Sequence, residues 1–205
     1  DAAMAALADG AGARFAADDG FVFGPPCPAL WAAIEQFGGS LRPKGLEQQL
    51  SKSACWSPNA NLEGRPASMP LGSPAHFKFE LVGEAEQAEA EDARGIMVYK
   101  VPIGDNKFVK AGLRSKARGV CSSIIKANEM LDPATHGQHK WTALFYSLSH
   151  RFDFWLRNSL PRDISEAAAM VDAAILAAAE EAMQNSFAAG SRALRRLRLP
   201  ARLKG

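Results

Sequence analysis

The chain has 205 residues, which is enough for one sizeable domain or for one domain with a helical appendage. Hydrophobic residues make up 47% and charged residues 22%, which excludes an intrinsically disordered chain, and the formal net charge is only +2. No apolar run approaches the length of a membrane span, and the N-terminus lacks the features of a secretory signal. It also lacks an initiator methionine, so we expect the chain to begin within a longer protein. Three widely spaced cysteines argue against a disulfide framework and for a reducing compartment.

Residues 1–12 are rich in alanine and are predicted to form the end of a helix. Residues 13–24 predict two short strands joined by a hairpin turn at Asp18, Asp19 and Gly20. A carboxylate pair at the tip of a buried hairpin costs desolvation energy unless a positive charge lies beside it. A divalent cation held by oxygen ligands is the usual partner. The alternative is an ordinary turn, in which Asp caps its own backbone and Gly supplies a positive φ.

The next segment is predicted to contain one helix and two or three strands. Pro28 opens a helix over residues 29–38, which Gly38 and Gly39 are expected to end. Residues 51–58 are a candidate strand, residues 59–75 a loop, and residues 76–82 a half-buried strand by their alternation. The acidic stretch 83–94 connects this strand to another over residues 95–104.

The rest of the chain is predicted to be helical. Apolar spacing indicates helices over residues 106–131, 138–159 and 163–188. Four aromatic side chains of the second helix are assigned to the helix core rather than to a base-stacking platform: Trp141, Phe145, Phe152 and Trp155. His136 and His139 are assigned to a loop at a helix start, because no further zinc ligands are apparent nearby. The predicted fold class is α+β, a small sheet with a helix followed by a helical bundle.

Charge is concentrated in three blocks. Residues 100–126 carry seven basic residues against one acidic residue, and residues 191–205 carry six basic residues and no acidic one. Residues 81–92 carry five acidic residues and no basic one. Such blocks favour a surface that faces a polyanion and an acidic loop. The alternative, an ordinary solvated helix face, remains open on charge alone.

Five short motifs occur in an order that is similar to a known family. They are FAADD at residues 15–19, GLEQQLSKS at 45–53, VPIG at 101–104, LSHRFD at 148–153 and RLPARLKG at 198–205. In this order the chain resembles the reverse transcriptase domain of non-LTR, target-primed retrotransposons, from the second half of the palm through the thumb. Ala16 stands where that family has an aromatic residue, and the earlier palm motif with its own metal-binding aspartate is not in the sequence.

The resemblance implies an α+β polymerase fragment with a partial palm over residues 1–104. A helical thumb would follow over 105–190, and a basic connection segment over 191–205. Asp18 and Asp19 would be catalytic residues that hold Mg²⁺, and Lys52 would lie near the leaving pyrophosphate. We expect the isolated chain to be inactive, because one aspartate motif cannot assemble a two-metal site.

The implied function is RNA-directed DNA polymerisation, the extension of a DNA primer on an RNA template. The template–primer backbone would be contacted by five residues of the basic helix: Lys107, Lys110, Arg114, Lys116 and Arg118. The expected partners are an RNA template, a DNA primer, deoxynucleoside triphosphates and the rest of the polymerase chain, with no membrane. The expected location is intracellular and nuclear. The alternative is a non-catalytic nucleic-acid-binding relic or a helical binding module whose Asp18–Asp19 is a turn.

Overall fold

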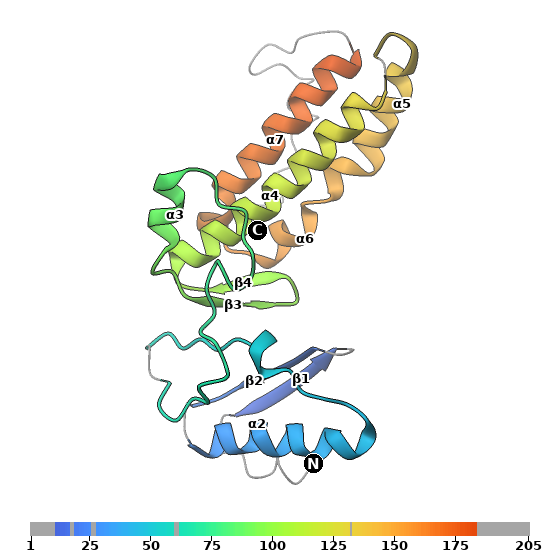
Figure 1. The fold of residues 1–205 in the computed structure, drawn as a ribbon. Helices are drawn as coiled ribbons and strands as arrows, with labels where there is room; N and C mark the ends of the chain where they lie inside the picture. The colour runs from blue at the N-terminus through green and yellow to red at the C-terminus, as the bar shows by residue number, and fades with distance from the viewer. Residues whose placement is uncertain (1–10, 17–18, 26–27, 60–61, 132, 184–205) are drawn as a thin grey trace. The chain divides into compact units, whose positions relative to one another are not determined.

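The computed structural model describes residues 11–16, 19–25, 28–59, 62–131 and 133–183. The basic segment expected over 191–205 and residues 1–10 of the expected N-terminal helix lie outside the described residues. The described chain is α+β, with two separate two-stranded antiparallel sheets and a set of helices (Figure 1). Among the described residues, no helix combines the length and apolarity needed to cross a membrane.

Contacts divide the chain into two compact units. We call Asp1–Lys78 with Glu91–Phe108 the hairpin unit, and Phe79–Ala90 with Val109–Gly205 the helical unit. Residues 79–90, which include most of the acidic block, therefore belong with the helices that follow β4.

The first sheet is the predicted strand pair. Strand β1 (Gly12–Ala16) pairs with the antiparallel strand β2 (Asp19–Phe23), which confirms the two strands. The predicted turn is wrong in part, because Asp19 and Gly20 belong to β2 and pair with β1. Backbone N–H and C=O groups gain partners when a ladder continues up to the connection, and this outweighs the turn preference of these two residues.

Helix α2 (Pro28–Leu41) begins at the predicted proline but continues through both glycines that were expected to end it. A Cβ on Gly38 would lie 2.4 Å from Oε1 of Gln48, so a glycine allows Gln48 to pack there. A glycine inside a helix costs only about 1 kcal/mol, which packing can offset. The chain instead turns after the 3₁₀ helix η1 (Arg42–Lys44), at Gly45 with φ of 75°.

A small core includes one side of α2. Trp31, Cys55 and Met69 are buried together, and the Trp31 indole N–H donates to the carbonyl of Glu63 at 2.7 Å. The predicted strand over 51–58 is wrong, since this segment holds the 3₁₀ helix η2 (Leu50–Lys52) and a single bridge between Cys55 and Leu71. The core thus depends on one tryptophan rather than on a continuous sheet.

The predicted strand over 76–82 and the acidic connection after it are both wrong. Residues 76–82 form no strand, and Lys78 has a φ of 52°, which is incompatible with an extended backbone. Helix α3 (Glu84–Ala90) takes the place of the acidic connection. Its sequence, EAEQAEA, consists of strong helix formers, and acidic residues in a first turn complement the helix dipole.

A hairpin replaces the single strand expected over 95–104. Strand β3 (Gly95–Val98) pairs with β4 (Val101–Gly104), and the turn residues Tyr99 and Lys100 have φ of 48° and 69°. Two successive positive φ angles are typical of the tight turns that match strand twist. The sequence lacks the Asn-Gly pair that signals such a turn, so the hairpin could not be recognised from the residues.

The helical unit is built on α4 (Asn106–Glu129), which confirms the predicted helix. The second predicted helix is divided into α5 (Pro133–Tyr146), the 3₁₀ helix η3 (Leu148–His150) and α6 (Asp153–Asn158). Helix α7 (Pro161–Met183) corresponds to the third. Helices α4, α5 and α7 run side by side (Figure 1). Residues of all three share one core with Leu148 and Phe152 from the interrupted stretch.

Candidate functional site

The predicted magnesium ligands are Asp18 and Asp19, of which the structure describes the backbone of Asp19 alone. Asp19 is the first residue of β2 and pairs with Ala16 across the hairpin. Asp18 lies outside the described residues, and so does the side chain of Asp19. In the part of the chain that the structure describes, no three His, Cys, Asp or Glu side chains gather as a metal site. Magnesium binding by Asp18 and Asp19 therefore stays a prediction.

Lys52 lies at the end of the 3₁₀ helix η2 in the hairpin unit, and it is exposed. The next residue, Ser53, is extended, so η2 and Lys52 form the entry to the segment that carries the buried Cys55. An exposed lysine on a short helix can reach a phosphate or simply remain solvated. Its predicted role near pyrophosphate is not tested by this placement.

The five predicted nucleic-acid-binding residues all lie on α4, but not on one face. Residues 107, 110, 114 and 118 follow the spacing of one helical stripe. Lys116 is two positions beyond Arg114 and so points about 160° away around the helix. Within the described chain, no carboxylate lies at ion-pair distance from Lys107, Lys110 or Lys116.

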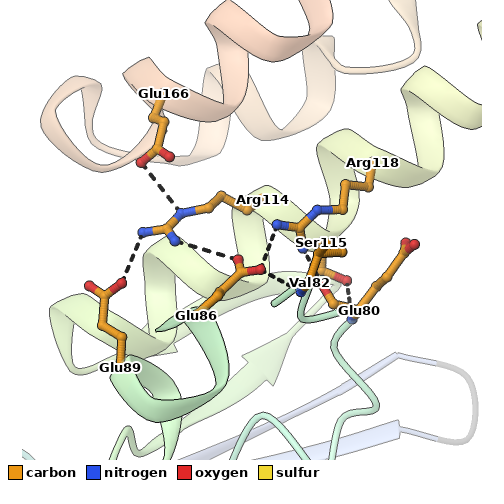
Figure 2. Close-up of polar contacts among 8 residues, drawn as sticks. All are labelled: Glu80, Val82, Glu86, Glu89, Arg114, Ser115, Arg118 and Glu166. Carbon is orange, nitrogen blue, oxygen red and sulfur yellow. Dashed lines mark hydrogen bonds and ion pairs between the residues drawn. The ribbon is translucent and has the colours of Figure 1, made fainter. Parts of the chain in front are cut away.

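Arg114 is surrounded by three carboxylates, as Figure 2 shows. Its guanidinium nitrogens lie 3.4 Å from Glu86 and 3.6 Å from Glu89 on α3, and 3.4 Å from Glu166 on α7. All three distances exceed the roughly 2.7–2.9 Å of a strong charge-assisted hydrogen bond. The buried Nε of Arg114 has no hydrogen-bond partner among the described residues. Arg114 is therefore neutralised without being tightly bound.

Arg118 is held more tightly. Its Nη2 donates to Oε2 of Glu86 at 2.6 Å, and its Nη1 donates to the backbone carbonyl of Glu80 (Figure 2). The Ser115 hydroxyl, between the two arginines in sequence, accepts the backbone N–H of Glu80 at 2.9 Å. Together these bonds fasten the segment before α3 onto α4.

Glu86 is the centre of this network, with 8% of its side chain exposed. It also accepts the backbone N–H of Val82 at 2.6 Å. Burial by itself works to raise the pKa of Glu86. The hydrogen bonds from Arg118 and Val82, with the positive charges of Arg118 and Arg114, together outweigh burial and hold that pKa below its ordinary value. The carboxylate is thus kept ionised beside two guanidinium groups.

We call this network the arginine clamp, and define it by Glu80, Val82, Glu86, Glu89, Arg114, Ser115, Arg118 and Glu166 (Figure 2). The basic block in the sequence predicted an external polyanion as the partner of the two arginines, whereas glutamates of the same chain lie there. One signal was available, because the acidic block at 81–92 and the basic block at 100–126 have opposite charge. Such blocks can neutralise each other within the fold.

A second ion pair lies in the helical unit. The ammonium group of Lys140, with 3% of the side chain exposed, lies 2.7 Å from Oε1 of Glu181, and Asn128 donates to the other carboxylate oxygen. The hydrogen bond from Lys140 is the largest cause of a lowered pKa at Glu181; burial opposes it, and the charge of Lys140 and the hydrogen bond from Asn128 add to it. This pair, which the sequence did not reveal, satisfies a charge that would otherwise be buried alone.

The aromatic and histidine predictions have mixed outcomes. Phe152 is fully buried in the helical core, and Trp141 and Trp155 pack against that core. Phe145 differs from the prediction, since it is 48% exposed and stacks on Trp141 with ring centroids 5.8 Å apart. Both predicted loop histidines lie within α5, where His136 alone interrupts the helix with non-helical φ and ψ. The ring centroids of His136 and His139 are 6.0 Å apart.

No protein-family model, curated protein or solved structure matches the chain.

Proposed function

We propose that the chain is part of an RNA-directed DNA polymerase, comprising the second half of a palm and a helical thumb. The observation that supports this most is the order of the elements. The β1–β2 hairpin, whose second strand begins at Asp19, is followed by α2, then by α3 and the β3–β4 hairpin, and then directly by a bundle that starts with α4. Apart from α3, this is the order that the motif resemblance implies.

In this proposal the chain supplies carboxylates and positive charge to nucleotidyl transfer. Asp18 and Asp19 would hold Mg²⁺, which lowers the pKa of a primer 3′-hydroxyl and neutralises charge that develops on the phosphates. A further aspartate, outside the printed sequence, would complete the site. Lys52 would supply positive charge near the leaving pyrophosphate.

The template–primer backbone would lie along the basic stripe of α4. Lys107 is exposed and Lys110 is half-buried on that stripe, and both are without a described carboxylate partner. Each lysine that neutralises a phosphate releases counterions, so binding should weaken as salt increases. Arg114 and Arg118 belong to the arginine clamp, and Lys116 lies on another face, so Lys107 and Lys110 carry the proposed contact.

Fluorescence anisotropy with a labelled RNA–DNA duplex at several salt concentrations tests this proposal. The Lys107→Gln/Lys110→Gln variant is expected to weaken binding and to reduce the slope of log affinity against log salt by about 2, since each phosphate contact contributes about 0.9. The matched control is Arg42→Gln/Lys44→Gln, which removes two exposed positive charges from η1. Equal losses in both variants, or no binding by the native chain at low salt, would contradict the proposal.

The alternative is a non-catalytic nucleic-acid-binding relic or a helical binding module. The arginine clamp favours this alternative, because it uses two of the five predicted phosphate-binding residues within the fold. The reading frame that precedes residue 1 separates the two proposals. An upstream strand-borne aspartate with a glycine-containing loop supports the polymerase, whereas unrelated sequence or a stop codon supports the alternative.

A further inference from the structure

We propose that residues 79–90 are a displaceable acidic strap, which covers Arg114 and Arg118 until a phosphodiester backbone takes its place. The inference rests on the proposed function, since it assigns a control to the same basic helix. The strap and both arginines belong to the helical unit, so the contact lies within one compact unit. When the strap leaves, two further cations join Lys110 on one stripe of α4.

The strap is attached to α4 by polar contacts. Helix α3 has seven residues, of which only Glu86 and Ala90 are buried. Val82, next to the helix, is 60% exposed, whereas Phe79 and Leu81 are partly buried. The strap therefore docks with a modest apolar area together with its ion pairs and hydrogen bonds to α4. The ion pairs are the contacts that salt and competing anions weaken.

The carboxylates of the clamp occupy positions that phosphates can take. Arginine binds carboxylate and phosphate with the same donor fork, so one anion can exchange for the other. Arg114 is the looser of the two, with carboxylates at 3.4–3.6 Å and a buried Nε that has no hydrogen-bond partner among the described residues. Two of those carboxylates, Glu89 and Glu166, are 47% and 62% exposed, so they can swing into water when a phosphate arrives.

Hydrogen exchange on the native chain tests the strap without nucleic acid. The backbone N–H of Val82, which donates to Glu86, reports directly on docking. With inorganic polyphosphate, exchange at Val82 and through α3 is expected to rise at least about tenfold over sodium chloride of equal ionic strength. Amides near Ile175 in the α7 core should not change. If the amides of Val82 and α3 exchange as slowly in polyphosphate as in sodium chloride, the proposal of a displaceable strap is wrong.

Two paired substitutions test its effect on binding. Glu86→Gln/Glu89→Gln removes the charges that face the arginines, and Glu84→Gln/Glu91→Gln makes the same charge change at nearby sequence positions that form no ion pair with a described residue. The first pair is expected to bind the RNA–DNA duplex at least about tenfold more tightly and to steepen the salt slope by about 2. The control should gain less than about threefold, because neither of its carboxylates forms a described ion pair with Arg114 or Arg118. Equal gains in both pairs would overturn the inference.

The outcomes separate the strap from the proposed function. If the duplex never binds at low salt but polyphosphate releases α3, the polymerase proposal fails and the strap stands. If the duplex binds while α3 stays protected under polyphosphate, the strap fails and the proposed function stands. Circular dichroism shows whether Glu86→Gln/Glu89→Gln still folds, and if it does not, exchange on the native chain decides.

Discussion

Glu86 illustrates how a single carboxylate can organise a surface. It contacts two arginines and one backbone N–H while only 8% of its side chain is exposed. Removing one member of a buried ion pair leaves the partner charge desolvated, which costs more than the pair itself contributes. The same glutamate that holds α3 against α4 therefore also determines whether Arg114 and Arg118 can remain partly buried.

The lowered pKa of Glu86 predicts a pH-dependent effect of Glu86→Gln. At neutral pH the substitution should reduce the free energy of unfolding by about 1–3 kcal/mol. Because the folded pKa lies below the unfolded value of about 4.3, the stabilising effect of the native carboxylate is complete above that pH. It is lost as the pH falls through the folded pKa, so the difference between native and variant should shrink below about pH 4.3.

Urea denaturation at several pH values between about 3 and 7 measures this difference across the range in which the carboxylate titrates. The control is Glu84→Gln, which changes the same charge on α3 without removing a described ion pair. A difference that stays constant across the acid range would show that Glu86 does not stabilise the fold through its charge.

At the scale of elements, turns account for two of the differences between sequence and structure. The prediction recognised β1 and β2 but assigned β3 and β4 to one strand, because Tyr99 and Lys100 are unusual residues for a turn with positive φ. It also ended α2 at Gly38–Gly39, although the left-handed residue is Gly45. In both cases a local preference of a few tenths to about 1 kcal/mol yielded to tertiary packing.

Lys100 therefore provides a test of the β3–β4 turn. At a φ of 69° the backbone of a residue with a Cβ is strained by roughly 1–2 kcal/mol. Glycine removes that strain, although it also increases the conformational entropy of the unfolded chain, which opposes folding. Lys100→Gly is expected to raise the free energy of unfolding by about 0.5–1 kcal/mol in urea.

Gly83→Ala is the counterpart with the opposite expected sign. Gly83 has a φ of 86°, and the position that a Cβ would take is open space. Only backbone strain therefore changes, and a loss of about 1 kcal/mol in the free energy of unfolding is expected. If both substitutions change the free energy of unfolding in the same direction, backbone strain at positive φ is not what determines the stability of these turns.

At the scale of the whole molecule, the chain passes between its two units three times. The strap, residues 79–90, leaves the hairpin unit, packs in the helical unit and returns before β3. The last passage between the units falls after Phe108, within α4. Contacts between segments that are distant in sequence, such as Glu86 with Arg118, create the strap's excursion into the helical unit.

The polymerase proposal predicts that the 205-residue chain alone does not extend a DNA primer on an RNA template with Mg²⁺. A two-metal site needs carboxylates from more than one motif, and Asp18–Asp19 is the one such motif that the resemblance assigns to these 205 residues. Gel-resolved primer extension with labelled primer measures this, with an intact retroviral reverse transcriptase as the positive control. Extension by the chain that Asp18→Asn abolishes would contradict this account of the site.

The sequence by itself determined the α+β class, the first strand pair, the start of α2 and the long helices α4 and α7. These elements follow from local signals: a proline at a helix start, apolar residues at helical spacing, and short aromatic strands. Tertiary structure alone decided that Glu86 on α3 neutralises Arg114 and Arg118. Charge composition cannot specify which opposite charges meet, because an ion pair forms only where packing brings two distant segments together.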